Sequence, residues 1–435
     1  MISRQPQAAK DFRRYLGSRS RTNDSEIRRG MRASLREGIP ANIVGNLLGG
    51  PLQTAFLLYL GFSSEQIGLV AAIPSFTLLI QIFIALGMQR WRNRRRLVTI
   101  FGTTHRTLWV ATGLIPLLFP EASWAPLYLI VFLLSFSFGQ AGGVIWTSLM
   151  ADIVPPSLRG RYFGIRNTTH WAVVSLTLLL GGQLMEWIPG GRGFTILFAV
   201  SALCVVWNGI ELSRYANPPF QPSQDGGSAG VRLFKPLRDR GFVTATLFIT
   251  IYILAQNIVV PLFSFVMLHR LHLSYSSVTL ITMLQNIVMM VSYIYWGNLN
   301  ARYPARTLLL WTFPIIALAC LAWFGLAALP VLLVLGAVHI LLGIGLGGYN
   351  LLVFNFLIGD TPKAERPMYV AVFSALTGIA GFVGPIVGGW VYKAAGDAPA
   401  WIQDYGVTGL AGAVLLLLSV AVAPLVFRRD KKGNV

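Results

Sequence analysis

The chain has 435 residues, of which 54% are hydrophobic and only 12% are charged, and its mean hydropathy is +0.62. This composition excludes an ordinary soluble protein, because a soluble fold cannot bury that much apolar surface. A helix needs about 20 apolar residues to cross the hydrocarbon core of a bilayer, so the chain can supply around twelve membrane-spanning helices.

The net charge of +19 comes from 35 Lys and Arg residues that lie almost wholly outside the apolar segments. This distribution indicates membrane topology rather than nucleic-acid binding, so we expect the lipid bilayer, and no nucleic acid, as a partner. Both cysteines, Cys204 and Cys320, fall inside apolar segments, and their spacing is not that of metal ligands. We therefore expect no disulfide, no metal and no cofactor.

Residues 1–36 begin the chain with ten Lys or Arg and no apolar run, which predicts a basic cytoplasmic tail. Within this tail Ile27, Met31 and Leu35 recur every four residues among arginines. That spacing is typical of a short helix lying on anionic lipid, and a solvated tail remains an open alternative.

Twelve apolar runs follow, separated by short polar loops. The first six predict an N-terminal bundle over 37–213, with helices at 37–60, 65–88, 97–119, 126–152, 163–185 and 194–213. A stretch rich in Pro, Gly and Ser at 214–241 then predicts a cytoplasmic linker. The last six predict a C-terminal bundle over 242–427, before a cytoplasmic tail at 428–435, with helices at 242–268, 274–298, 306–328, 331–357, 367–393 and 404–427.

The loops divide into two groups by their content of Lys and Arg. One group comprises the tail, the linker, the C-terminus and the loops that follow 65–88, 126–152, 274–298 and 331–357, and it holds nearly all of these residues. The opposite group holds only Arg192, Arg270 and Lys393. Because basic loops stay in the cytoplasm, both termini are expected to be cytoplasmic, in a multi-pass protein of the cell inner (plasma) membrane.

The second half of the chain repeats features of the first. Pro51 and Leu52 recur 210 residues later as Pro261 and Leu262, and Asp152, which closes the helix at 126–152, recurs as Asp360. Each copy has an even number of helices, so the two copies must have the same orientation. The sequence therefore predicts an all-α polytopic membrane protein with two parallel-related six-helix bundles.

Twelve spans, this repeat and short basic loops after 65–88 and 274–298 resemble the major facilitator superfamily. Its best-known motif reads approximately G-x-L-x-D-R-x-G-R-R, and residues 87–96 here read G-M-Q-R-W-R-N-R-R-R, with Trp91 at the Asp position. The resemblance implies a monomeric secondary transporter that moves a small-molecule substrate by alternating access. It also implies that 37–60, 126–152, 242–268 and 331–357 line a central cavity.

Polar side chains within the apolar helices are the candidate substrate ligands. Asn42, Asn46 and Gln53 are spaced to share one face of the first predicted helix. Amides of this kind can replace the hydration shell of a polar solute, although hydrogen bonds between helices would use the same groups. The other candidates are Gln140, Trp146, Gln256, Asn257, Gln285, Asn286, His339 and Asn350.

Arg106 lies ten residues beyond Arg96, which places it about 15 Å into its span. No acidic residue is expected near the middle of a span, so Arg106 should meet either an anionic substrate or backbone carbonyls. Arg166 is expected to anchor its helix at the interface. The inner groups that could titrate near neutral pH, and so couple transport to protons, are His105, His170 and His339.

A cytoplasmic gate is expected where Asp152 and Asp360 end equivalent helices. The proposed partners are Arg92 and Arg95 in the first copy, with Arg302 and Arg306 in the second. The alternative is that the aspartates interact only with nearby loop residues such as Arg159 and Arg366.

The sequence contains no nucleophile elbow, no P-loop, no HExxH pattern and no paired carboxylates within an apolar span, so we expect no enzyme activity. The leading hypothesis is transport of a small polar neutral or anionic solute. The alternatives are an efflux pump or flippase for amphipathic compounds or lipids, and a transporter-like assembly factor or receptor that does not transport.

Overall fold

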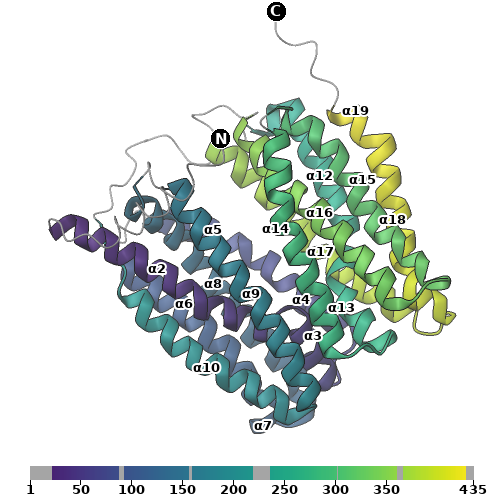
Figure 1. Cartoon of the computed structure of the whole chain (residues 1–435), viewed down its shortest axis with the longest axis horizontal. Coiled ribbons are helices and arrows are strands. Elements are labelled where there is room, and N and C mark those ends of the chain that lie inside the picture. Colours follow the sequence, from purple (N-terminus) through teal and green to yellow (C-terminus); the bar gives the residue numbers. More distant parts are fainter. Residues whose placement is uncertain are drawn as a thin grey trace, which may run out of the picture.

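The computed structural model describes residues 22–87, 93–155, 159–218, 236–300, 302–359 and 366–427. Within these ranges the chain is helical and contains no strand, which confirms the all-α fold (Figure 1). Consecutive labelled helices group into twelve rods, where a rod is one helix or a run of helices that continue in the same direction. Eight of the described helices are long and apolar enough to cross a membrane, judged by length and composition.

Six rods make up the N-terminal half. They are α2 (Thr22–Leu47) with α3 (Gly50–Tyr59); α4 (Ser64–Phe76) with η1 (Thr77–Leu79) and α5 (Ile80–Gly87); α6 (Arg94–Ala111) with η3 (Thr112–Leu114) and α7 (Ile115–Leu118); η4 (Glu121–Ser123) with α8 (Trp124–Ile153); α9 (Arg159–Trp187); and α10 (Gly191–Ser213).

The C-terminal half contains the other six. They are η6 (Pro236–Arg238) and α12 (Arg240–Val259) with η7 (Val260–Leu262), α13 (Phe263–Phe265) and η8 (Val266–Arg270); α14 (Tyr275–Asn300); α15 (Ala305–Leu321) with η9 (Ala322–Ala327); α16 (Val331–Gly359); α17 (Arg366–Ala394); and η10 (Ile402–Gly406) with α18 (Val407–Leu417), η11 (Leu418–Val422) and α19 (Ala423–Phe427).

The first helix begins at Thr22, well before the expected start at residue 37. Its early turns belong to the bundle: Met31 and Ser34 are fully buried, and the Met31 carbonyl accepts a hydrogen bond from the Tyr162 hydroxyl at 2.9 Å. The expectation of a tail over 22–36 was therefore wrong, because arginines on the exposed face lower the average hydropathy of a helix whose other face is packed. Residues 1–21 of that tail lie outside the described residues, as do 219–235 of the expected linker and 428–435.

The helices expected to correspond in the two halves both depart from regular α-helix next to the matched proline. Pro51 lies in the first turn of α3, after the break at Leu48–Gly49, and Pro261 lies in the first turn of η7, after α12 ends at Val259. Proline fits the first turn of a helix, where its missing N–H has no partner to lose. The matching breaks support the internal repeat.

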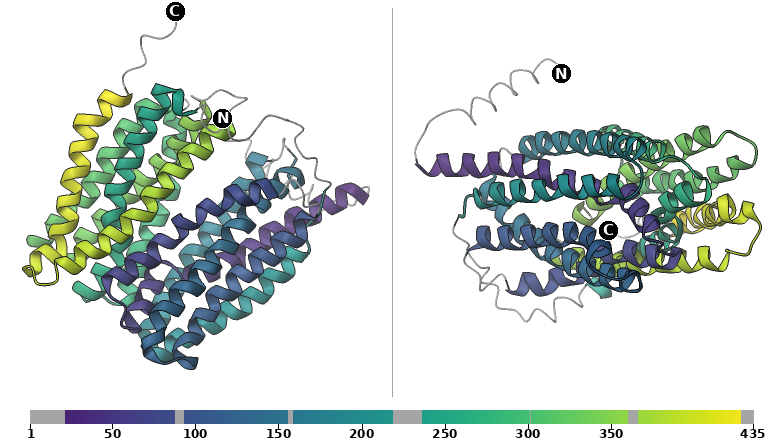
Figure 2. Two further views of the ribbon diagram at one scale, coloured as in Figure 1. Left: turned by 180° about the vertical axis from the view of Figure 1, so that it is seen from behind. Right: turned by 90° about the horizontal axis from the view of Figure 1, so that it is seen from below.

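The two halves meet mainly through α4 with α17 and through α9 with α14. At one end of this interface, the Ser64 hydroxyl donates to the Gly389 carbonyl at 3.1 Å, and Lys393 Nζ lies 2.8 Å from Glu65 Oε2. Gly68 of α4 approaches the Pro385 carbonyl so closely that no Cβ would fit between them. The bundles separate toward the opposite end, where α2 begins and α19 ends (Figures 1 and 2).

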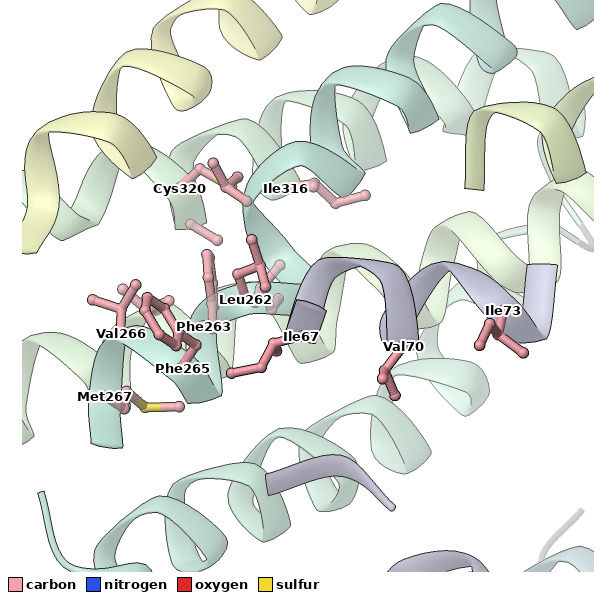
Figure 3. Close-up of a cluster of buried hydrophobic side chains, with 14 of the residues drawn as sticks. Ile67, Val70, Ile73, Leu262, Phe263, Phe265, Val266, Met267, Ile316 and Cys320 are labelled. Atoms are coloured by element: carbon pink, nitrogen blue, oxygen red, sulfur yellow. The ribbon is translucent and has the colours of Figure 1, made fainter. Parts of the chain in front are cut away.

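Apolar side chains from both halves form one buried cluster at the closed end. Ile67 and Val70 of α4 belong to the same cluster as Leu262 and Val266 of the C-terminal half (Figure 3). This shared core holds the halves together on the side that faces away from the start of α2 and the end of α19.

Candidate functional site

A cavity of about 490 Å³ lies within the N-terminal half and is lined by α2, α6, α8, α9 and α10. Small residues such as Gly38, Gly102 and Gly139 leave room for it between the helices. Its polar and charged lining side chains are Glu37, Asn42, His105, Arg106, Gln140, Trp146, Arg166 and His170.

Glu37 is the acidic residue of this cavity, and its carboxylate is held by one residue of α10 and one that follows α10. Oε1 accepts a hydrogen bond from Asn208 Nδ2 at 3.1 Å, and Oε2 accepts one from the Tyr215 hydroxyl, also at 3.1 Å. Asn208 Nδ2 also donates to the Glu37 carbonyl at 3.1 Å. All three residues are buried, so the carboxylate has a defined position in the cavity wall.

Two arginines flank this carboxylate, one at each oxygen. Arg106 Nη2 lies 3.6 Å from Oε1 of Glu37, and Arg166 Nη2 lies 3.8 Å from Oε2. Both distances allow attraction between the charges but exceed the usual length of an N–H···O hydrogen bond. One negative charge is thus shared between two positive charges.

These contacts correct two sequence-based expectations. Arg106 does have an acidic neighbour, because α2 carries Glu37 deep into the bundle instead of beginning there. Arg166 lines the cavity and is not only an interfacial anchor. Sequence analysis missed Glu37 because hydropathy placed it at the boundary of the first helix. The spacing of Met31, Ser34 and Glu37 on one helical face was the signal that could have found it.

The arginine side chains are oriented by local contacts. Arg106 Nη1 donates to the Gly102 carbonyl, one turn earlier in α6, at 3.1 Å. The Arg166 guanidinium carbon lies 4.7 Å from the centre of the Trp146 ring, a cation–π geometry. Trp146 Nε1 in turn donates to the Tyr215 hydroxyl at 3.1 Å, so Trp146 supports both Arg166 and the group that holds Glu37.

Two of the three histidines considered for proton coupling line the cavity. His105 Nδ1 lies 2.9 Å from both the Ser135 carbonyl and the Ser135 hydroxyl. The His170 ring packs on Gly38, where a Cβ would collide with it. His339 is buried in the other half, with Nδ1 at 2.8 Å from the Leu335 carbonyl, and does not line this cavity.

Asn42, Gln140 and Trp146 also line the cavity, together with Arg106. Asn42 Nδ2 donates to the Gly38 carbonyl at 2.6 Å, and Gln140 Oε1 accepts a hydrogen bond from Gln81 Nε2 at 2.7 Å. Each therefore keeps part of its hydrogen-bonding capacity for a ligand.

Asn46 and Gln53 do not line this cavity. Asn46 Nδ2 donates to the carbonyl of Asn42 in its own helix at 2.8 Å, and Gln53 Nε2 donates to the Tyr128 hydroxyl at 3.0 Å. Gln53 thus makes the hydrogen bond between helices that was the alternative to substrate binding, whereas the bond of Asn46 stays within its own helix.

The polar candidates of the C-terminal half do not line this cavity. Asn257 packs against Gly384 of α17, the Gln285 carbonyl faces Gly343 of α16, and Asn350 is exposed. Gln256 and Asn286 are half-buried. Among the described residues, the lining of this cavity comes from the N-terminal half alone.

At the expected gate, Asp152 pairs with a different arginine. Arg94 Nη2 lies 2.6 Å from Asp152 Oδ2, and Arg94 also donates to the Ser148 hydroxyl at 2.9 Å and to the Pro218 carbonyl at 3.2 Å. Arg95 instead donates to the Tyr215 carbonyl at 3.3 Å. The expected pairing of Asp152 with Arg95 was therefore wrong. Arg94, the buried first residue of α6, is the arginine that contacts Asp152.

The remaining gate residues are only partly described. Arg306 lies over the Phe356 ring, 5.2 Å from its centre, and Arg302 is exposed. Arg92 and Asp360 lie outside the described residues, as do the side chains of Arg159 and Arg366.

The chain matches one protein-family model and is similar to several solved structures. The model of the family described as Major Facilitator Superfamily matches residues 41–265 and 245–435, and no curated protein matches the chain. A mutant of the nucleoside transporter NupG is similar in structure, with a TM-score of 0.72 at 14% identity, covering 92% of this chain and 100% of that one.

Two further solved structures are also similar. A bacterial homologue of the human lysosomal transporter Spinster, in an inward-facing and unoccupied conformation, has a TM-score of 0.69 at 16% identity, covering 94% of this chain and 98% of its own. A D-xylose–proton symporter has a TM-score of 0.68 at 14% identity, covering 91% of this chain and 98% of its own. At these identities the similarity shows a shared fold.

Proposed function

The chain belongs to the Major Facilitator Superfamily, and we propose that it is a secondary transporter that carries a small organic anion. The observation that carries the proposal is the pair of guanidinium groups, Arg106 and Arg166, that line one cavity with a single carboxylate between them. Arginine binds carboxylate and phosphate groups through its planar set of donors, so a pair of arginines is suited to an anionic ligand.

The charge balance supports an anion. Glu37 offsets one of the two positive charges and stands too far from either guanidinium to take up its donors. A negative group that enters the cavity would complete the neutralisation in surroundings where charges interact more strongly than in water. Trp146 and Phe136 add aromatic surface to the lining, which suits an organic solute.

Similar structures include transporters of nucleosides and of D-xylose, so the fold itself does not dictate a charged substrate. The buried arginine pair is what favours an anion over a neutral solute in this chain. It also opposes a cationic amphipathic substrate, which the two guanidiniums would repel.

The arrangement of the bundles supports alternating access. With cytoplasmic termini, as the basic loops predict, the end closed by α4 and α17 faces outward, and the protein is open to the cytoplasm. In the opposite state the contacts of Gly68 and Gly389 would part.

Uptake into proteoliposomes tests the proposal. We expect the purified protein to transport at least one organic acid from a panel that also holds sugars, nucleosides and cationic dyes. Arg96→Gln, at an exposed position in the first turn of α6, should transport like the wild type. Transport of neutral or cationic compounds alone would contradict the proposal. Failure with every compound would favour the assembly-factor alternative.

A further inference from the structure

We propose that Glu37 selects the charge of the substrate, so that the cavity accepts monoanions and disfavours dianions. This inference rests on the proposed function, because it concerns the same cavity. It assigns Glu37 a role distinct from that of a counter-ion for folding, and it specifies the class of anion.

The position of Glu37 is the first part of the argument. Its two oxygens face different arginines, Oε1 toward Arg106 and Oε2 toward Arg166. The carboxylate thus bridges two helices of the cavity wall, α6 and α9, rather than pairing with one of them. A bound anion that contacts both arginines must lie close to Glu37.

The second part is that Glu37 cannot easily move aside. Asn208 of α10 and Tyr215, two residues beyond the end of α10, are both 0% exposed and hold the two oxygens with hydrogen bonds of 3.1 Å each. Breaking these bonds would cost the buried Tyr215 hydroxyl its acceptor and the buried Asn208 amide one of its two acceptors on Glu37, which is unfavourable. The negative charge is therefore a fixed feature of the cavity, and Asn208 and Tyr215 are its positioning residues.

Charge counting gives the third part. Glu37, Arg106 and Arg166 are the acidic and arginine side chains of the lining, and together they carry a net charge of +1 when His105 and His170 are neutral. A monoanion brings this total to zero. A dianion leaves one negative charge in excess beside a carboxylate that cannot withdraw. In a partly buried site, one unit charge at a few ångströms changes an affinity by roughly ten- to a hundredfold.

Two probes of similar shape but different charge test the inference. Benzenesulfonate is a monoanion, whereas phenyl phosphate is largely a dianion at about pH 8, because the second pKa of a phosphate ester is about 6. Binding of each to the purified full-length protein is measured by titration calorimetry. We expect the wild type to prefer benzenesulfonate, and Glu37→Gln to reduce that preference by roughly ten- to a hundredfold.

Matched variants make the result specific. Glu211 is a carboxylate of the same half that pairs with Arg214 and does not line the cavity. Glu211→Gln should therefore leave the preference for benzenesulfonate over phenyl phosphate unchanged. Gln140→Glu adds a carboxylate to the lining, and we expect it to weaken benzenesulfonate binding by about tenfold or more. This variant also tests the charge count if Glu37→Gln does not fold.

The outcomes separate this inference from the proposed function. A wild type that prefers phenyl phosphate, or a preference that Glu37→Gln leaves unchanged, overturns the role of Glu37 while anion binding stands. Unchanged benzenesulfonate binding in Gln140→Glu does the same. Absence of binding by both probes and by the panel of organic acids overturns the proposed function and this inference together.

Discussion

Arg94 and Asp152 form an ion pair whose two members lie in different surroundings. Their side-chain atoms approach to 2.6 Å, yet the Arg94 side chain is 1% exposed and that of Asp152 is 45% exposed. Both residues belong to the N-terminal half, so in this conformation the pair joins α6 to α8 and does not bridge the two bundles.

This asymmetry predicts the effect of Asp152→Asn. The substitution removes the negative charge that lies 2.6 Å from the buried Arg94 guanidinium, and we expect a loss of about 1–3 kcal/mol in the stability of the protein. A thermal melt in detergent measures it, and Arg94→Gln combined with Asp152→Asn should recover part of the loss. A change in the distance between spin labels on the two bundles, without a loss of stability, would instead support a gating role for Asp152.

The cavity arginines should be needed for transport but not for insertion into the membrane. We expect Arg106→Gln and Arg166→Gln each to lower organic-anion uptake by roughly ten- to a hundredfold, because each removes a charge-assisted contact. Arg106→Lys keeps the charge without the planar donors and should restore uptake only in part. Uptake at the wild-type rate by either glutamine variant would remove that arginine from the site.

The closed end of the protein depends on backbone contact at Gly389. A Cβ there would meet the Ser64 carbonyl oxygen and the Glu65 Cα, so Gly389→Val should cost the closed conformation about 1–3 kcal/mol. Spin labels at Glu121 and Leu329, in loops of the two halves at this end, should report a longer distance. Lys393→Gln breaks an exposed ion pair worth about 0–1 kcal/mol and serves as the control. Equal distances in both variants would contradict the packing argument.

The orientation in the membrane can be measured with single cysteines in a Cys204→Ala, Cys320→Ala background. Ser123 and Ala398 lie at the end closed by α4 and α17, and cysteines there should react with an impermeant reagent in intact cells. A cysteine at Gly226, in the expected linker, should react only after the cells are opened. The reverse labelling pattern would invert the topology.

Most of the fold could be predicted from the sequence because the apolar runs mark the helices and a few prolines recur in both halves. Apolar runs of about 20 residues have one stable solution in a bilayer, which is a helix. Pro51 and Pro261 could be matched between the halves because each is followed by Leu at the same offset in the repeat. The start of the first helix could not be predicted, since its early turns are buried against protein rather than lipid, and hydropathy does not report that kind of burial.

Of the candidate site residues, only some of those in the N-terminal half line the cavity. Arg106, Gln140 and Trp146 stand out as polar or amphipathic groups in apolar helices, and they do share a cavity. Asn257 and Asn350 have the same signature but pack on a neighbouring helix or remain exposed. Hydropathy indicates the depth of a residue along its helix, but the direction in which it points depends on how the helices pack.

The unbroken run of α2 from Thr22 through Glu37 has a practical consequence for anyone who expresses this protein. A hydropathy plot would suggest trimming the chain shortly before residue 37, as though the preceding residues were a dispensable leader. Such a deletion would remove Met31 and Ser34 from the fold and leave Glu37 on a frayed end. The shortened protein would keep the residues that line its cavity but lose the packing that positions Glu37 among them, while its remaining hydrophobic segments still inserted as before.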